Sequence, residues 1–399
     1  MDETPPPYRA LEVFQAFLIQ GLTAFGGPVA HLSYFRREFV ERRAWLSEAA
    51  FADLLALAQF LPGPASSQLG MAIGLRRAGF SGLLAAWVGF TLPAATAMIA
   101  IAYAAPSLTE LLGKGFLHGL QIAVAAVVLQ ALVAMARALA VGPIRSGIAI
   151  GAAGGLLIAH GPVAQIMALG AGVVFGLAFL REPAPVEPDD PATRKVPIPV
   201  SIAALAAFAV LLGLLPVLAR VLNDPTLDLA AIFYRAGALV FGGGHVVLPL
   251  LQSEIVEHGW LDQDSFLSGY GVVQALPGPL FSFAGFVGAA QQVAPSGWRG
   301  GLTALVAIFL PGLLLVLGVL PFWDRLKTVP AARAALAGIN AAVVGVLAAA
   351  LWNPVLTTAI QRPSDWALAA GAFVFLAVAR LPAWLVVLGF AAAIGVFSR

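Results

Sequence analysis

Hydrophobic residues form long stretches along most of the chain, and charged residues, prolines and glycines separate one stretch from the next. An α-helix rises 1.5 Å per residue, so about 20 apolar residues cross the hydrocarbon core of a bilayer. The pattern predicts about 10–13 transmembrane segments, with short hairpins as the alternative to full spans at 146–180 and 365–397. The candidate stretches are 12–30, 49–74, 81–104, 115–140, 146–160, 163–180, 198–219, 228–248, 264–290, 299–321, 334–352, 365–379 and 382–397.

One hydrophilic interruption, at 181–199, divides these stretches into two groups. It contains six prolines together with several charges, which prevent both a regular helix and burial in lipid. We therefore predict an N-terminal repeat over 1–180, a proline-rich linker with one unmatched transmembrane segment over 181–227, and a C-terminal repeat over 228–399.

The second half of the chain repeats motifs of the first half, in the same order, at an offset of about 215 residues. An odd number of spans between equivalent points turns the second copy upside down in the membrane, and inverted repeats are typical of secondary transporters. The predicted fold is an all-α polytopic membrane protein made of two homologous inverted-topology repeats. The matched elements are Phe25-Gly26-Gly27 with Phe241-Gly242-Gly243, Trp45-Leu46 with Trp260-Leu261, Gln59-Phe60-Leu61-Pro62-Gly63-Pro64 with Gln274-Ala275-Leu276-Pro277-Gly278-Pro279, and Leu92-Pro93 with Leu310-Pro311.

Composition agrees with a membrane protein and excludes several other classes. Apolar residues make up 60% of the chain and charged residues 11%, less than half of the share of about 25% in soluble domains. The net charge of +2 and the absence of a basic patch argue against nucleic acid as a partner. The chain has no cysteine, its histidines lack metal-ligand spacing, and it carries no catalytic motif, so we expect no metal, no cofactor and no enzymatic activity.

The strongest local signal is the sequence Leu-Pro-Gly-Pro in the middle of two hydrophobic stretches. Two prolines around a glycine interrupt a helix, and the freed backbone groups are tolerated in lipid only where they face protein or a watery cavity. The half-helix that follows would direct its first amides and the positive end of its dipole at an anion; a simple packing kink is the alternative. The candidates are Pro62, Gly63, Pro64, Ser66 and Ser67 in the first half, and Pro277, Gly278, Pro279 and Ser282 in the second.

A second pair of candidates comes from adjacent glycines, which let the backbone approach a ligand closely or let two helices cross tightly. Gln59 and Gln274, three residues before the breaks, offer a donor and an acceptor to a polar solute, or bond a neighbouring carbonyl. Ser47 and Asp262 are predicted helix N-caps. The glycine candidates are Phe25, Gly26 and Gly27, and Phe241, Gly242, Gly243, Gly244 and His245.

Two charged residues stand out in apolar surroundings. Arg235 lies in a run that is otherwise apolar from 232 to 251, and such an arginine needs a partner or an anion, unless its side chain extends to the membrane surface. Asp53, six residues before Gln59, is the candidate for proton coupling; an interfacial carboxylate is the alternative.

The duplicated motifs resemble the chromate ion transporter family in its long, two-domain form, over essentially the whole chain. The resemblance implies secondary transport of chromate, a tetrahedral oxyanion, as efflux across the bacterial inner membrane that confers chromate resistance, with sulfate as a structural analogue. It places the family's motif positions at Phe25, Gly26, Gly27, Pro28, Gln59, Pro62, Gly63 and Pro64 and at their second-half partners. Gly244 and His245 depart from the ending at Pro28.

Other functions stay open at this point. They are uptake or exchange of sulfate or another oxyanion, a passive anion channel, and a membrane-embedded protein that binds a lipid-like ligand. A polar, basic cavity at mid-depth would favour transport, and a wide apolar cavity open to lipid would favour the last of these. Coupling to protons or to the membrane potential, and assembly as a homodimer, are also compatible with the sequence.

Overall fold

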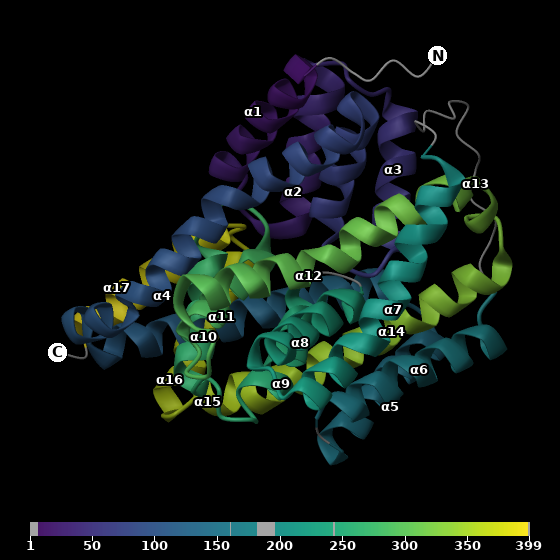
Figure 1. The fold of residues 1–399 in the computed structure, drawn as a ribbon. Coiled ribbons are helices and arrows are strands. Elements are labelled where there is room, and N and C mark those ends of the chain that lie inside the picture. The colour runs from purple at the N-terminus through teal and green to yellow at the C-terminus, as the bar shows by residue number, and fades with distance from the viewer. Residues whose placement is uncertain (1–6, 160, 182–195, 242–243, 398–399) are drawn as a thin grey trace.

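The structure is a computed structural model that describes residues 7–159, 161–181, 196–241 and 244–397, and in these residues it is helical without strands (Figure 1). The main helices are α1 (Pro7–Thr23), α2 (Gly27–Arg36), α3 (Glu48–Phe60), α4 (Ala65–Leu139), α5 (Pro143–Ile158), α6 (Pro162–Phe179), α7 (Ile198–Leu222), α8 (Pro225–Leu239), α9 (Val247–Ile255), α10 (Gln263–Gln274), α11 (Phe283–Ala290), α12 (Gly297–Val319), α13 (Trp323–Leu326), α14 (Pro330–Ala350), α15 (Thr357–Ala359), α16 (Pro363–Ala377) and α17 (Ala383–Phe397). Short 3-10 turns are η2 (Gly244–Val246), η3 (Leu280–Ser282) and η4 (Leu320–Phe322), and π-helical turns are η1 (Arg37–Arg42) and η5 (Leu351–Leu356).

Six helices in the described residues are long and apolar enough to cross a bilayer, and four shorter apolar helices accompany them. The chain is therefore a polytopic helical membrane protein. The segment at Ile198–Leu222 is peripheral, since only 11% of its most apolar window is buried, against 67% for Pro330–Ala359. The other long spans are Ala65–Leu108, Glu110–Leu139, Pro162–Phe179 and Gly297–Leu326.

Several of the expected hydrophobic segments are not single rods. The stretch 12–30 was expected as one segment, but α1 ends at Thr23 and α2 begins at Gly27. The reason is local, because Gly26 and Gly27 adopt φ values of 100° and 76°, which a continuing right-handed helix cannot accommodate.

The long helix α4 folds back on itself. The backbone leaves helical geometry at Ala78 and Gly79, and again at Gly113. A Cβ atom on Gly82 would collide with the carbonyl oxygen of Gly74, although eight residues of a straight helix span about 12 Å. The chain therefore reverses direction near Gly79, and α4 contains three helical pieces. In the second half, Gly300 of α12 meets Gly288 of α11 in the same way.

The last helix of each half packs against the other half of the chain. α17 packs along α4, where a Cβ on Gly119 would lie 2.7 Å from the Cα of Ala391. α6 packs along α14, where a Cβ on Gly338 would collide with the carbonyl oxygen of Gly172. Small residues at these crossings allow the backbones to approach closely, as in other membrane proteins. Figure 1 shows α12 across the centre of the view, with α1–α3 above it and α8, α9 and α14 below.

Candidate functional site

The helices are interrupted at both Leu-Pro-Gly-Pro sequences. α3 ends at Phe60 and α4 begins at Ala65, while α10 ends at Gln274 and helical structure resumes with η3 at Leu280. Gly63 and Gly278 adopt φ values of 122° and 101°, which glycine reaches without the steric cost that a side chain adds. Ser47 caps α3 by accepting from the Ala50 amide at 3.2 Å, and Asp262 caps α10 by accepting from the Ser265 amide at 2.8 Å, which confirms both predicted N-caps.

Each break is bonded to the other half of the chain. The amide of Gly63 donates to the carbonyl of Val240 at 2.7 Å, and the amide of Gly278 donates to the carbonyl of Ala24 at 3.0 Å. Val240 and Ala24 occupy matching positions, each directly before a Phe-Gly-Gly sequence. Each Leu-Pro-Gly-Pro break therefore docks against the Phe-Gly-Gly region of the opposite half.

We call these contacts the first junction (61–64 with Val240) and the second junction (276–279 with Ala24). α12 reaches the first junction, since the Cα of Gly312 is 3.5 Å from a Cβ placed on Gly63. α4 reaches the second junction, since the Cβ of Ala94 is 3.0 Å from a Cβ placed on Gly278. Matching parts of the two halves thus form both junctions.

The backbone at the breaks is less available to a ligand than expected. The Gly63 and Gly278 amides are used by the carbonyls of the opposite half, and the Ser282 amide bonds Pro279 at 2.9 Å within a 3-10 turn. A full α-helical N-terminus follows only the first break, at Ala65. Of the two expected half-helix N-termini, the second therefore begins as a 3-10 turn.

Both junctions are followed by a buried serine hydroxyl that has no hydrogen-bond partner in the described residues. Ser67 is 2% exposed and Ser282 is 0% exposed, and neither hydroxyl has a hydrogen-bond partner in the described residues. The two serines stand three residues after Pro64 and Pro279, at matching places. Thr91, buried on α4, also has an unpartnered hydroxyl. An unsatisfied buried polar group costs about 1–3 kcal/mol, and a water molecule or a ligand beside these hydroxyls would supply the missing partner.

The remaining polar candidates differ between the halves. Gln59 is exposed, whereas its counterpart Gln274 is 8% exposed. At the first junction the side chain of Gln68, fully buried, donates to the Pro62 carbonyl at 2.8 Å and closes the break. Ser66 is buried beside it in the first turn of α4.

Residues around the Phe-Gly-Gly sequences contribute packing and two imidazoles, of which that of His31 is fully buried. The ring of Phe25 lies 5.9 Å from that of Trp384, and Phe241 is half-buried. The sequence did not single out His31, whose Nε2 lies 3.2 Å from the Ala24 carbonyl that also accepts from Gly278. His245, which follows Gly244 in η2, places Nδ1 2.7 Å from the hydroxyl of Tyr270. The candidates Gly242 and Gly243 lie outside the described residues.

The two charged candidates have protein partners. Arg235 Nη2 lies 2.6 Å from Glu254 Oε1, so a carboxylate supplies the partner that an arginine in apolar surroundings needs. Asp53 Oδ1 accepts from Trp323 Nε1 at 2.9 Å and from Lys327 Nζ at 3.1 Å. Burial lowers the pKa of Lys327, but hydrogen bonds with Asp324 and Asp53 outweigh this and raise it. The roles of Arg235 in binding and of Asp53 in coupling stay predictions.

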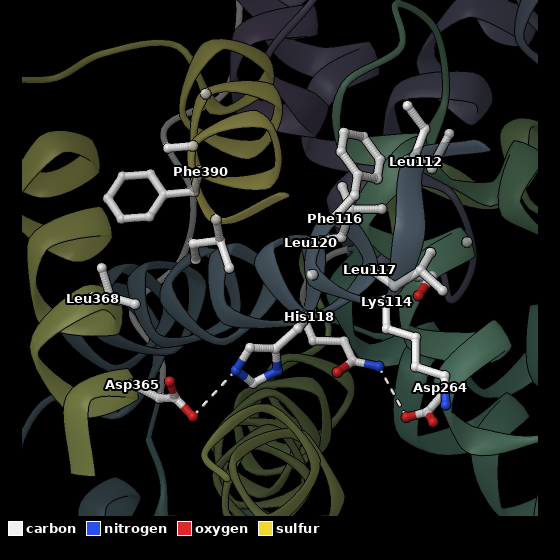
Figure 2. A pocket seen from close by; sticks show the side chains of 18 of the residues that line it. Leu112, Lys114, Phe116, Leu117, His118, Leu120, Asp264, Asp365, Leu368 and Phe390 are labelled. Atoms are coloured by element: carbon white, nitrogen blue, oxygen red, sulfur yellow. Dashed lines mark hydrogen bonds and ion pairs between the residues drawn. The ribbon is translucent and has the colours of Figure 1, made fainter. Parts of the chain in front are cut away.

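A cavity of about 1190 Å³ lies at a different place, between α4, α10, α16 and α17 (Figure 2). At its polar end, His118 Nε2 lies 3.2 Å from Asp365 Oδ2 and Gln121 Nε2 donates to Asp264 Oδ1 at 2.9 Å. The residues of the two breaks do not line it. The part of the chain that the structure describes holds no group of three or more metal-ligating side chains.

Comparison with known proteins places the chain in a family. The model of the chromate transporter family matches residues 11–177 and again 227–396. A chromate transport protein of Pseudomonas aeruginosa is 33% identical over 397 residues, which cover 96% of this chain and 89% of the relative. A chromate transport protein of Cupriavidus metallidurans is 28% identical, with 87% of this chain and 83% of the relative covered.

A more distant relative, an uncharacterised transporter of Methanocaldococcus jannaschii, is 24% identical over 85% of this chain and 83% of its own length. No solved structure matches the chain. The family model covers most of the chain in two consecutive regions, and those regions contain both junctions. The chain therefore belongs to the chromate transporter family.

Proposed function

We propose that this chain is a secondary transporter of chromate, and that it exports the ion across the bacterial cytoplasmic membrane. The family, and the fact that both relatives are chromate transport proteins by name, support chromate as the cargo. The observation that carries the proposed site is the matched pair of buried, unpartnered hydroxyls at Ser67 and Ser282.

The chemistry of these groups suits a tetrahedral dianion. Chromate presents four oxygens that only accept hydrogen bonds, so its site must supply donors. The hydroxyls of Ser67, Ser282 and Thr91 are donors of this kind, and the helix dipole at Ala65 adds positive potential. Arg235 is neutralised by Glu254, so the proposed site relies on neutral donors. Binding of moderate strength follows, which permits release on the other side of the membrane.

The twofold match of the family model and the matched junctions support two inverted repeats, with the repeats over 1–180 and 228–399. Each break is held by one backbone hydrogen bond to the opposite repeat. Rocking of one repeat against the other would rearrange both junctions together and expose the site to alternate sides.

The test is uptake of labelled chromate into proteoliposomes by a Ser67→Ala/Ser282→Ala variant. A hydrogen bond to a charged group contributes about 1.5–3 kcal/mol, so we expect uptake at low chromate to fall by about tenfold or more. Ser253→Ala is the matched control, because Ser253 is equally buried but bonds the Leu250 carbonyl of its own helix at 3.2 Å. Uptake by the double variant equal to that of the control would contradict the site.

Direction, coupling and selectivity need separate arms of the same assay. Vesicles of defined orientation distinguish efflux from uptake, and an imposed pH or voltage gradient distinguishes coupling to protons from coupling to the membrane potential. The same donors suit sulfate, so competition by sulfate separates a chromate exporter from a general oxyanion exchanger. A continuous conductance without saturation would indicate an anion channel.

A further inference from the structure

The cavity between α4, α10, α16 and α17 has apolar walls that run along helices. α17 lies antiparallel to the last piece of α4, since Gly119 meets Ala391 while Gly395 meets Phe116. α16 runs parallel to the same piece, since His118 reaches Asp365 and Gln130 donates to the Leu376 carbonyl. Several helical turns of apolar side chains are therefore open to the cavity. They include Leu112, Phe116, Leu120, Leu368, Phe375 and Phe390.

The polar end of this cavity is built from the starts of helices. Asp262 is the N-cap of α10, Asp264 lies in its first turn, and Asp365 lies in the first turn of α16. Lys114 directly follows the turn of α4 at Gly113. The starts of α10 and α16 carry the charged side chains of this cavity, as is common where helices meet the polar interface of the bilayer. In Figure 2, Asp365, His118 and Asp264 lie on one side of the cavity, and Phe390 and Phe116 lie on the other.

Charges of both signs meet at this polar end. Asp365 is 3% exposed, and its Oδ2 accepts from the backbone amides of Arg362 and Gln361 at 2.8 and 2.9 Å and lies 3.2 Å from His118 Nε2. Asp262 and Asp264 are exposed carboxylates, and Lys114 and Arg362 are exposed cations. This balance is a poor match for chromate, which the carboxylates would repel, and for an anionic lipid headgroup.

We propose that this cavity binds a phospholipid with a zwitterionic, primary-ammonium headgroup, of the phosphatidylethanolamine type. Its ammonium group donates to the carboxylates of Asp262 and Asp264, and its phosphate lies against Lys114 and Arg362. Its acyl chains fill the apolar walls. The bound lipid contacts both repeats, since α4 belongs to the first and α10, α16 and α17 belong to the second. The proposal does not depend on which ion is transported.

Filling the cavity tests the acyl-chain part of the proposal. Gly389 of α17 lines the cavity, and a Cβ placed there meets no atom within 4 Å, so Gly389→Phe adds a ring without a backbone clash. Gly170 on α6 has the same open surroundings and does not line the cavity, so Gly170→Phe is the matched control.

The readout is native mass spectrometry of the full chain, extracted from phosphatidylethanolamine vesicles into mild detergent. We expect one retained lipid per chain in the wild type and in Gly170→Phe, and loss of most of it in Gly389→Phe. Equal retention by the two variants, or no retained lipid in the wild type, would overturn the proposal.

The headgroup is tested with Asp262→Asn/Asp264→Asn, which keeps the N-cap and removes both carboxylates. We expect the wild type to prefer phosphatidylethanolamine over phosphatidylglycerol and phosphatidylcholine by about tenfold, and the double variant to lose most of this preference. Asp224→Asn/Asp228→Asn at the start of α8 is the matched control. A wild type without preference, or a preference that survives in Asp262→Asn/Asp264→Asn, would refute the assignment of the headgroup.

Discussion

At the first junction an α-helix resumes directly after the break, at Ala65, whereas at the second junction it resumes through the 3-10 turn η3. A buried glutamine, Gln68, closes the first break on Pro62, and a phenylalanine, Phe283, stands at the matching place in the second. Both junctions nevertheless keep a glycine with positive φ, a backbone bond to the opposite half and a buried serine hydroxyl. The shared features agree with the proposed binding role of both junctions, and the differences make the two junctions unequal.

A second comparison concerns two carboxylates at matching places, Glu38 and Glu254, which lie 216 residues apart. Glu38 pairs with Arg42 at 3.0 Å and also with Arg43, both from the turn that follows it. Glu254 pairs with Arg235 from the preceding helix. The two halves neutralise these matching carboxylates in different ways, and the ion pair with Glu254 gives Arg235 a structural role.

The largest effect on chromate uptake is expected from a variant that changes both junctions together. Pro62→Ala/Pro277→Ala restores one backbone donor at each break and removes one of the two prolines that oppose a continuous helix there, which weakens the hold of the Gly63 and Gly278 amides on their partners in the opposite half. We expect chromate uptake to be abolished while the protein still inserts in the membrane. Pro216→Ala, in the interior of α7, is the control and should retain uptake. Normal flux in the double variant would show that the breaks are packing kinks.

A smaller effect, on the free energy of unfolding, is expected to distinguish Glu254 from Glu38. Arg235→Gln leaves Glu254 without its cation and should destabilise the protein by roughly 3 kcal/mol, while Arg42→Gln should cost under about 1 kcal/mol because Arg43 still pairs with Glu38. Thermal unfolding measures both, and Arg235→Gln/Glu254→Gln should recover most of the loss.

The same Arg235→Gln variant tests the role of Arg235 in binding. If the arginine also helps to hold the anion, the half-saturation concentration for chromate rises. An unchanged value would remove Arg235 from the binding site and leave it a structural role only.

The two halves also differ at Asp53, because the second half has Ser268 at the matching place. A role of Asp53 in coupling would therefore belong to the first half alone. If Asp53 carries the coupling proton, Asp53→Asn keeps exchange of chromate but loses its acceleration by an imposed pH gradient. Asp324→Asn is the matched control, since Asp324 is the other carboxylate partner of Lys327, at 2.8 Å. Equal responses of both variants to the gradient would leave Asp53 with only an interfacial, structural role.

The smallest effect concerns the helix caps before the two breaks. Ser47→Ala and Asp262→Ala each remove one cap and should each cost about 1 kcal/mol. Ser47→Asp and Asp262→Ser should cost little, because either side chain caps a helix. Chemical unfolding of the four variants checks this, and a loss confined to one half would mean that only one of these helices is limited by its cap.

Much of the fold follows from local patterns. Runs of apolar residues predict the spans, proline and glycine predict the helix breaks, and Ser47 and Asp262 predict caps, because each of these signals acts within a few residues. The reversal of the chain near Gly79 lies between the predicted stretches 49–74 and 81–104 and agrees with two separate segments. The close contact between Gly74 and Gly82 at this reversal follows only from the folded chain.

Contacts between residues far apart in the sequence could not be predicted, because the signals used act only over a few residues. Asp53 and Trp323 are 270 residues apart, and Gln121 and Asp264 are 143 apart. No local pattern specifies such pairs, so the partners of Asp53 and Arg235 and the cavity beside α17 emerge only from the folded chain. The only sequence signal for Thr91 is weak: it is a hydroxyl-bearing residue directly before Leu92-Pro93 in a mostly apolar stretch.

The location of the bound ion tests the central claim most directly. Chromium scatters anomalously, so diffraction from crystals of the full chain grown with chromate fixes the position of the ion without any assumption about the site. We predict a chromium position that places a chromate oxygen within hydrogen-bonding reach of the hydroxyl of Ser67 or Ser282, at the helix breaks. A chromium position in the cavity beside His118 and Asp365, with none at the breaks, would contradict the account.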